Sequence, residues 1–168
     1  NTLIIFASDN GAAIQAPIKI LNCNAGFKGR KGTLYEGGIR VPFIVNQPGM
    51  VPIQTLDNLI YFPDMMPTLA ALAKGTKHLP KQINGINILP LFYGKQVDTD
   101  NRLLYWEFPG KQRAARKGDW KCVTIHPNQP LELYNLKEDP EETNNLAKKY
   151  PRRVKEFDEE MQRMHIPT

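Results

Sequence analysis

The sequence predicts an α/β fold, in which part of a larger sheet precedes a small antiparallel sheet that carries a C-terminal helix. Residues 2–7 form a continuous apolar, β-branched run, which is typical of a strand buried on both faces in a parallel sheet. Four short strand-like segments lie between residues 103 and 136 and are separated by turn residues. Residues 152–164 then carry apolar side chains at helical spacing.

The first hundred residues alternate between apolar runs and loops. Residues 11–31 are rich in Asn, Gly and Lys, and we expect a long loop there, of the kind that is usually functional or disordered. A second strand is expected over residues 39–46. Residues 64–74 are predicted to form a helix, with Asp64 as N-cap and Pro67 in the first turn.

The elements expected after residue 100 are shorter. The predicted strands occupy residues 103–108, 112–118, 119–125 and 131–136, and the turn residues between them favour antiparallel pairing. Residues 141–149 and 152–164 are predicted as closing helices. The second helix should pack on the sheet through one apolar stripe, formed by Val154, Phe157, Met161 and Met164.

Composition narrows the function classes. With 168 residues and 41% apolar content, the chain can bury one moderate core, or one core plus a small subdomain. No apolar run approaches the roughly 20 residues that a membrane span needs. The net charge of +5 favours acidic partners, but basic and acidic residues are interleaved and no nucleic-acid-binding signature is present. We expect neither a membrane nor a nucleic-acid partner. Cys23 and Cys122 could pair or stay free, and sequence leaves both open.

Asp9 and Asn10 follow directly on the first predicted strand. Ligands of open α/β sheets collect at the carboxyl ends of strands, and carboxylate and amide oxygens suit Ca²⁺ or Mg²⁺. Asp-Asn-Gly is also a common turn signal. Two donors are fewer than the roughly 6 to 8 oxygens that Ca²⁺ takes, so further ligands would have to come from elsewhere.

Lys31 lies in a glycine-rich segment, GRKGTLYEGGIRVP, which spans residues 29–42. Glycines let the backbone approach an anion closely, and a lysine ammonium is a compact charge with three donors. Such a lysine can equally be a solvent-exposed loop residue. Glu36 and Arg40 are expected to form a local ion pair that shapes the turn.

The two segments together resemble the sulfatase family. Residues 8–11 match its S-D-N-G box and residues 30–42 match its G-K-G-T-x-Y-E-G-G-x-R-V-P box, with Arg30 where a glycine is usual. The resemblance implies an alkaline-phosphatase-like core. It also implies that Asp9 and Asn10 are ligands of the active-site Ca²⁺, and that Lys31 is a catalytic residue that contacts the substrate sulfate.

Looser collinear matches continue to Glu142, so the resemblance covers nearly the whole chain. By this match, residues 1–100 would be the C-terminal part of the sulfatase core domain and residues 101–168 a small C-terminal α+β subdomain. His126 could contact substrate from that subdomain, or it could be an exposed turn residue. A sulfated small molecule or glycan would be the substrate.

The family's nucleophile is a formylglycine made from Cys or Ser in a Cys/Ser-x-Pro-x-Arg segment, and this sequence contains no such segment. The chain starts at Asn1 on an apolar run, without a signal segment. We therefore expect it to be the C-terminal portion of a longer sulfatase, inactive alone. The parent would be periplasmic or extracellular, because sulfated glycans are mostly extracellular.

Two other functions fit the sequence less well. A phosphoester hydrolase of the same superfamily would be expected to carry a His-rich two-metal site, and no Asp/His cluster is present. A basic module that binds acidic glycans would be expected to place its Lys and Arg residues on one face, and their spacing shows no such period.

Overall fold

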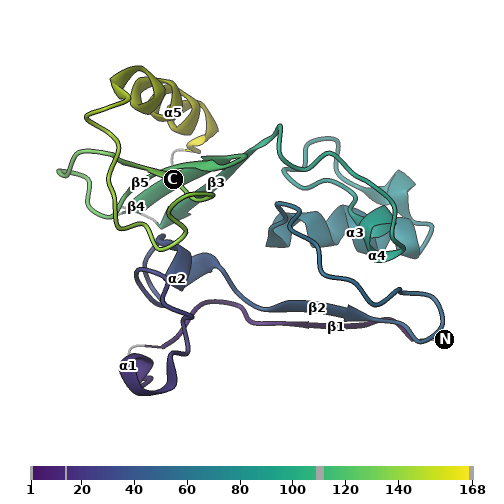
Figure 1. Ribbon diagram of the computed structural model, residues 1–168. Helices are drawn as coiled ribbons and strands as arrows, with labels where there is room; N and C mark the ends of the chain where they lie inside the picture. Colours follow the sequence, from purple (N-terminus) through teal and green to yellow (C-terminus); the bar gives the residue numbers. More distant parts are fainter. Residues whose placement is uncertain (1, 14, 109–111, 167–168) are drawn as a thin grey trace. The chain divides into compact units, whose positions relative to one another are not determined.

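The computed structural model describes all residues except 1, 14, 109–111 and 167–168 (Figure 1). The chain forms two compact units. The first unit comprises residues 1–6 and 43–101, and the second unit comprises residues 7–42 and 102–168. The loop that carries the candidate site residues thus shares a unit with the C-terminal sheet. None of the described helices is long and apolar enough to cross a membrane.

In the first unit, strands β1 (Ile4–Ala7) and β2 (Phe43–Asn46) form a two-stranded sheet. Its helices are η1 (Phe62–Asp64), α3 (Met65–Leu72), η2 (Thr76–His78) and α4 (Leu89–Phe92). The buried centre of this unit is made by Ile88, Leu91 and Phe92, against which both strands pack.

Strand β1 is less buried than its sequence predicts. Ile5 packs on the core of the first unit, whereas Ile4 and Phe6 are 57% and 60% exposed. Ile44 of β2 is 58% exposed. The described residues provide β1 with one neighbour, β2, which runs in the opposite direction in Figure 1. The parallel neighbours that such an apolar strand favours are therefore not among the described residues.

The helix predicted over residues 64–74 is confirmed in α3, but Asp64 does not cap it. The fully buried Asp64 carboxylate accepts hydrogen bonds from the backbone N–H of Tyr61 at 3.0 Å and of Ile86 at 2.9 Å. It therefore caps the preceding turn, η1, and ties it to a loop 22 residues further along the chain. Sequence could identify the cap residue but not its distant partner.

The second unit is built on the predicted antiparallel sheet. Its strands are β3 (Leu103–Phe108), β4 (Gln112–Lys117), β5 (Trp120–Thr124) and β6 (Glu132–Asn135), paired in that order. Helix α5 (Pro151–Met164) covers one face (Figure 1). It packs there through Phe157 and Met161.

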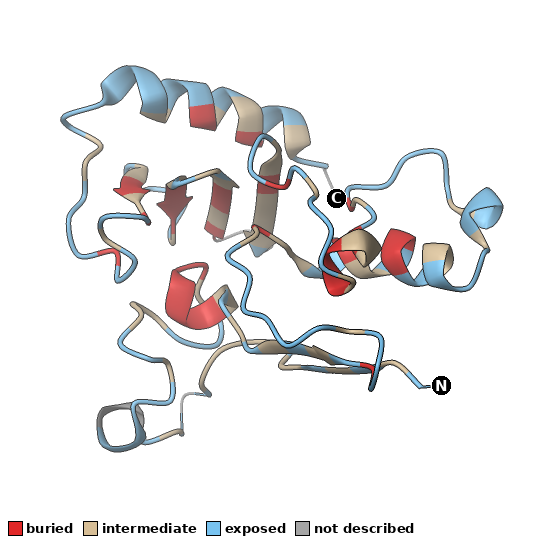
Figure 2. Cartoon of the chain, turned by 45° about the vertical axis from the view of Figure 1, so that its right-hand side comes forward, coloured by how far each residue is buried: buried red, intermediate tan, exposed pale blue. Residues whose placement is uncertain are grey.

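The two faces of this sheet have different partners, as the period of two along a strand requires. Ala115, Cys122 and Leu133 face α5. Ala114, Val123 and Tyr134 face the loop segment that contains Leu34 and Tyr35. Within the second unit, most of the residues that Figure 2 marks as buried lie in these strands and in the short helix α2 (Glu36–Ile39). The glycine-rich segment therefore forms one layer of the second unit.

The helix predicted over residues 141–149 is wrong. Other partners take up backbone N–H groups of this segment: Asp139 accepts from Asn144 N at 2.8 Å, and Leu146 N donates to Leu133 O of β6 at 2.8 Å. Asn145 accepts from Ala147 at 3.0 Å. Asp and Asn compete with helix formation in this way, and the segment forms turns.

The strand predicted over residues 39–46 begins later, at Phe43. Residues 36–39 form one helical turn, α2, in which the backbone N–H of Arg40 donates to Glu36 O at 2.7 Å. The short helix α1 (Ile18–Leu21) lies within the predicted loop.

The two cysteines are free. Cys122 is fully buried in β5, and burial raises the pKa of its thiol to about 12. Cys23 is exposed. The alternative of a disulfide between them is therefore not realised.

Candidate functional site

The turn that follows β1 lies directly against the glycine-rich segment. The backbone N–H of Gly11 donates to Gly38 O at 2.9 Å, and that of Lys31 donates to Ala12 O at 2.9 Å. A Cβ atom on Gly11 would lie 1.9 Å from Gly37 O, so only glycine permits this approach. The two segments singled out by sequence are thus brought together.

Asp9 and Asn10 present their oxygens at the end of β1. Asn10 Nδ2 donates to Asp9 Oδ1 at 3.0 Å, and Ser8 Oγ donates to Asn10 O at 2.8 Å. A carboxylate and an amide oxygen fit part of a Ca²⁺ coordination sphere. The part of the chain that the structure describes contains no group of three or more His, Cys, Asp or Glu residues that could hold a metal. The pair is therefore at most a partial site.

The Lys31 side chain is exposed, whereas the loop around it is fixed. Gln112, at the start of β4, accepts a hydrogen bond from Leu34 N at 3.0 Å and donates one to Gly32 O at 2.7 Å. Sequence analysis missed Gln112, because it lies 78 residues from Leu34. Within the described residues, no carboxylate forms an ion pair with Lys31, so its charge is available to an external anion.

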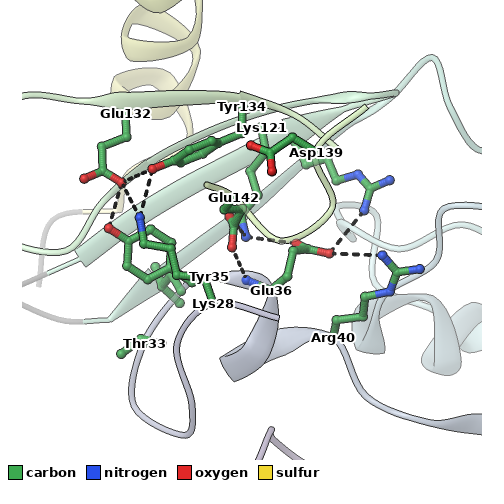
Figure 3. A network of polar contacts seen from close by, with 12 residues as sticks. Lys28, Thr33, Tyr35, Glu36, Arg40, Lys121, Glu132, Tyr134, Asp139 and Glu142 are labelled. Carbon is green, nitrogen blue, oxygen red and sulfur yellow. Dashed lines mark hydrogen bonds and ion pairs between the residues drawn. The ribbon is translucent and has the colours of Figure 1, made fainter. Parts of the chain in front are cut away.

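A buried ion cluster anchors the far end of the same segment (Figure 3). Lys121 Nζ donates to Glu36 Oε1 at 2.9 Å and lies 2.9 Å from Glu142 Oε1, the latter without hydrogen-bond alignment. Glu142 Oε2 accepts from Glu36 N at 2.7 Å. Arg40 and Arg116 lie 3.7 and 3.6 Å from Glu36 Oε2. The ion pair predicted between Glu36 and Arg40 is confirmed.

All three central side chains of this cluster are nearly inaccessible. Lys121, Glu36 and Glu142 are 0%, 3% and 1% exposed. Burial raises the pKa of Glu142, although the Lys121 ammonium acts in the opposite direction. The cluster therefore depends on charge pairing inside the protein, and it links α2 to β5 and to the turn after β6.

A second cluster joins Lys28 to β6. The hydroxyls of Tyr35 and Tyr134 donate to Glu132 Oε2 at 2.7 and 2.6 Å, and Lys28 Nζ donates to Tyr134 Oη at 2.9 Å. Burial would raise the pKa of Glu132, but the two hydroxyl hydrogen bonds and the Lys28 charge lower it overall. Burial and Glu132 raise the pKa of both tyrosines.

We expect Glu132→Gln to lower stability by about 1–2 kcal/mol at pH 7, since hydrogen bonds to a charged group are stronger than neutral ones. The folded-state pKa of Glu132 is lowered, so its stabilisation is present above the unfolded-state pKa and lost as pH falls through the folded-state pKa. The difference in Tm between wild type and variant should therefore shrink between pH 5 and pH 3. Exposed Glu138→Gln is the matched control. A difference that stays constant with pH would contradict the assignment.

His126 lies in the exposed turn after β5. Its carbonyl oxygen accepts from Thr124 Oγ1 at 2.8 Å, and its Nδ1 accepts from Asn128 N at 3.3 Å. These contacts order the turn. The described hydrogen bonds do not join His126 to the loop that carries Lys31, and its contact with substrate stays a prediction.

A shallow cavity of about 540 Å³ lies beside the glycine-rich segment. It is lined by Ala16, Pro17, Ile20, Asn24, Arg30 and Thr33. Arg30 is the charged residue of this lining and has no ion-pair partner among the described carboxylates. The cavity thus combines apolar walls with one available guanidinium.

Comparison with known proteins places this chain in a family. The sequence model of the family described as N-sulphoglucosamine sulphohydrolase, C-terminal, matches residues 27–166. A sulfatase of Formosa agariphila is 33% identical over 90% of this chain and 30% of its own length. An N-acetylgalactosamine-6-O-sulfatase of Bacteroides thetaiotaomicron is 30% identical over 95% of this chain and 35% of its own length. The chain spans about a third of these relatives.

Solved structures give the same result. A protein from work on the metabolism of multiple glycosaminoglycans by Bacteroides thetaiotaomicron matches 98% of this chain and 38% of its own, with a TM-score of 0.83 and 29% identity. Ps i-CgsB in complex with k-i-k-neocarrahexaose matches 98% of this chain and 36% of its own, with a TM-score of 0.80 and 28% identity. These structural matches confirm the α/β, alkaline-phosphatase-like fold class expected from the sequence. The chain belongs to the sulfatase family, and its match lies in the family's C-terminal part.

Proposed function

We propose that the chain supplies the C-terminal portion of a sulfatase that hydrolyses sulfate esters of sugars. The observation that carries this proposal is the pairing of two loops. The Asp9–Asn10 turn and the Lys31 segment are hydrogen-bonded to one another, and Asp9 and Lys31 are exposed. Family membership supports the proposal, and it favours a sulfate ester over the phosphoester of the alternative function.

In this proposal Lys31 binds the sulfate. Its loop backbone is held by Gln112, so the point from which the Lys31 side chain extends is fixed before substrate arrives. A preorganised cation of this kind stabilises charge as it develops in the transition state. Lys31 thereby acts on the sulfuryl oxygens.

Asp9 and Asn10 would hold part of the Ca²⁺ sphere through the carboxylate and the amide oxygen. A bound Ca²⁺ supplies electrostatic stabilisation of the sulfuryl oxygens. The nucleophile would be a formylglycine from outside residues 1–168, since no Cys or Ser of this sequence lies in the family's motif. His126 would contact the substrate from the C-terminal subdomain.

Arg30 and the neighbouring cavity support a sulfated sugar as substrate. The guanidinium can bind a second anionic group, such as another sulfate or a carboxylate, while the apolar walls would contact the ring. Relatives named for sulfated sugars agree with this class: one is an N-acetylgalactosamine-6-O-sulfatase.

The isolated chain is expected to show no sulfatase activity, whereas the longer protein that contains it should hydrolyse aryl sulfates and sulfated sugars. The chain holds the proposed sulfate contact but no formylglycine segment. A fluorogenic aryl sulfate with Ca²⁺ is the assay, and Lys31→Ala in the same chain is the control. Ca²⁺-dependent turnover by the chain above that control would overturn the proposal that the nucleophile lies outside residues 1–168. Phosphate-ester turnover alone by the longer protein would favour the phosphoester hydrolase.

A further inference from the structure

We propose that Gln112 is a positioning residue for Lys31, and this inference rests on the proposed function. Gln112 is 7% exposed and reaches from β4 into the loop. Its amide oxygen accepts from Leu34 N at 3.0 Å, and its amide nitrogen donates to Gly32 O at 2.7 Å. One side chain therefore bridges the two peptide groups that flank Thr33, immediately after Lys31.

The turn over residues 30–33 closes on itself, because Thr33 N and Thr33 Oγ1 donate to Arg30 O at 3.0 and 2.9 Å. Gln112 adds what these local bonds do not supply, a connection between this turn and the sheet. Gly29 and Gly32 have φ values of +83° and +88°, and glycine gains no rigidity from its side chain. Leu34, in contrast, is 7% exposed and packs in the core between loop and sheet. Gln112 thus connects the glycine-containing turn to Leu34, the first buried residue after it.

The second anchor of the segment, the Lys121–Glu36–Glu142 cluster, lies further along the chain. Gln112 bonds the residue next to Lys31, whereas the cluster begins at Glu36, five positions away. The cluster holds the segment on the sheet, and the near bridge sets the direction in which the Lys31 side chain leaves the loop.

The bridge has a chemical requirement that can be tested. Both backbone groups are satisfied only by a side chain that donates and accepts at the same time, which a primary amide does. In Gln112→Glu, an ionised carboxylate still accepts from Leu34 N but faces Gly32 O without a proton. A protonated carboxyl donates again. In Gln112→Met both hydrogen bonds are absent at every pH.

The experiment measures kcat/KM for a sulfated sugar with the longer protein, as the ratio of variant to wild type at each pH. We expect both variants to lose about 10- to 100-fold at pH 7.5, because small displacements of a positioned group are costly. The Gln112→Glu ratio should rise about tenfold towards pH 5, whereas the Gln112→Met ratio stays flat. Gln129→Glu, in an exposed turn, is the control, and its kcat/KM should equal that of wild type at both pH values.

Amide hydrogen exchange at Leu34, measured by NMR on the chain itself, gives a readout that does not depend on turnover. Exchange should accelerate at least tenfold in Gln112→Met and, at neutral pH, in Gln112→Glu. Unchanged exchange, or a Glu variant whose kcat/KM ratio does not vary with pH, would overturn the positioning role. A wild-type protein that exchanges as expected but hydrolyses no sulfate ester would overturn the proposed function instead.

Discussion

Lys121→Met should lower the free energy of unfolding of the second unit by about 3–5 kcal/mol, the usual cost of removing one partner from a buried ion pair. The ammonium lies 2.9 Å from carboxylate oxygens of both Glu36 and Glu142. Removing it leaves two nearly inaccessible carboxylates facing one another. Arg40 and Arg116 lie further from Glu36, at 3.7 and 3.6 Å, and replace only part of the lost interaction.

Both tryptophans, Trp106 and Trp120, belong to the second unit, so denaturation followed by tryptophan fluorescence reports on this unit. Lys117→Met, at an exposed position of β4, is the matched control and should change stability by less than about 0.5 kcal/mol. A loss below about 1 kcal/mol in Lys121→Met would show that the cluster contributes little.

Glu142→Gln separates charge from hydrogen bonding in the same cluster. A glutamine oxygen can still accept from Glu36 N, which Glu142 binds at 2.7 Å. The buried negative charge is removed while Lys121 keeps its partner Glu36. Because burial already raises the pKa of Glu142, its ionised form is costly, and the loss should be clearly smaller than in Lys121→Met.

The C-terminal sheet and helix could be predicted because their signals are local. The strands β3 to β6 alternate between two apolar faces, and α5 carries its core contacts Phe157 and Met161 at helical spacing. Each face has a partner within the described chain, so the pattern and the burial agree.

Predictions failed where distant or side-chain interactions override the local pattern. Residues 141–149 have a helical composition, yet Asp139 and Asn145 side chains bind their backbone N–H groups. The sequence of strand β1 predicts burial on both faces, yet Ile4 and Phe6 are exposed. The spacing of apolar residues indicates which side chains favour burial. It does not indicate whether the described residues provide a surface that covers them.

The site residues expected from the sequence stay a prediction, whereas the side chains that support their loop could not be predicted at all. Asp9, Asn10 and Lys31 carry recognisable chemistry in short segments, and the backbone bonds of Gly11 and Lys31 bring these segments together. Gln112 and Lys121 lie in ordinary strand positions. Their partners are 78 and 85 residues away, a separation over which one sequence holds no pairing signal.

Lys31→Ala in the longer protein should reduce kcat/KM for sulfate esters by about 100- to 1,000-fold, the range for removing one preorganised donor from a transition state. The fold should hardly respond, because the side chain is exposed and pairs with none of the described carboxylates. Lys31→Arg keeps the charge but replaces a compact ammonium by a planar fork, so activity should recover only in part.

Lys137→Ala, at an exposed turn of the second unit, is the matched control and tests whether loss of any one surface charge weakens binding of an anionic substrate. Its kcat/KM should stay within about twofold of wild type, because exposed charges are screened by salt.

An unchanged kcat/KM in Lys31→Ala would assign Lys31 to the solvated surface. A fall in Tm of more than about 5 °C would instead make it a structural residue, since such a shift corresponds to about 1 kcal/mol or more. A large loss of kcat/KM together with a small change in Tm distinguishes a sulfate-binding lysine from a solvated surface lysine and from a structural one.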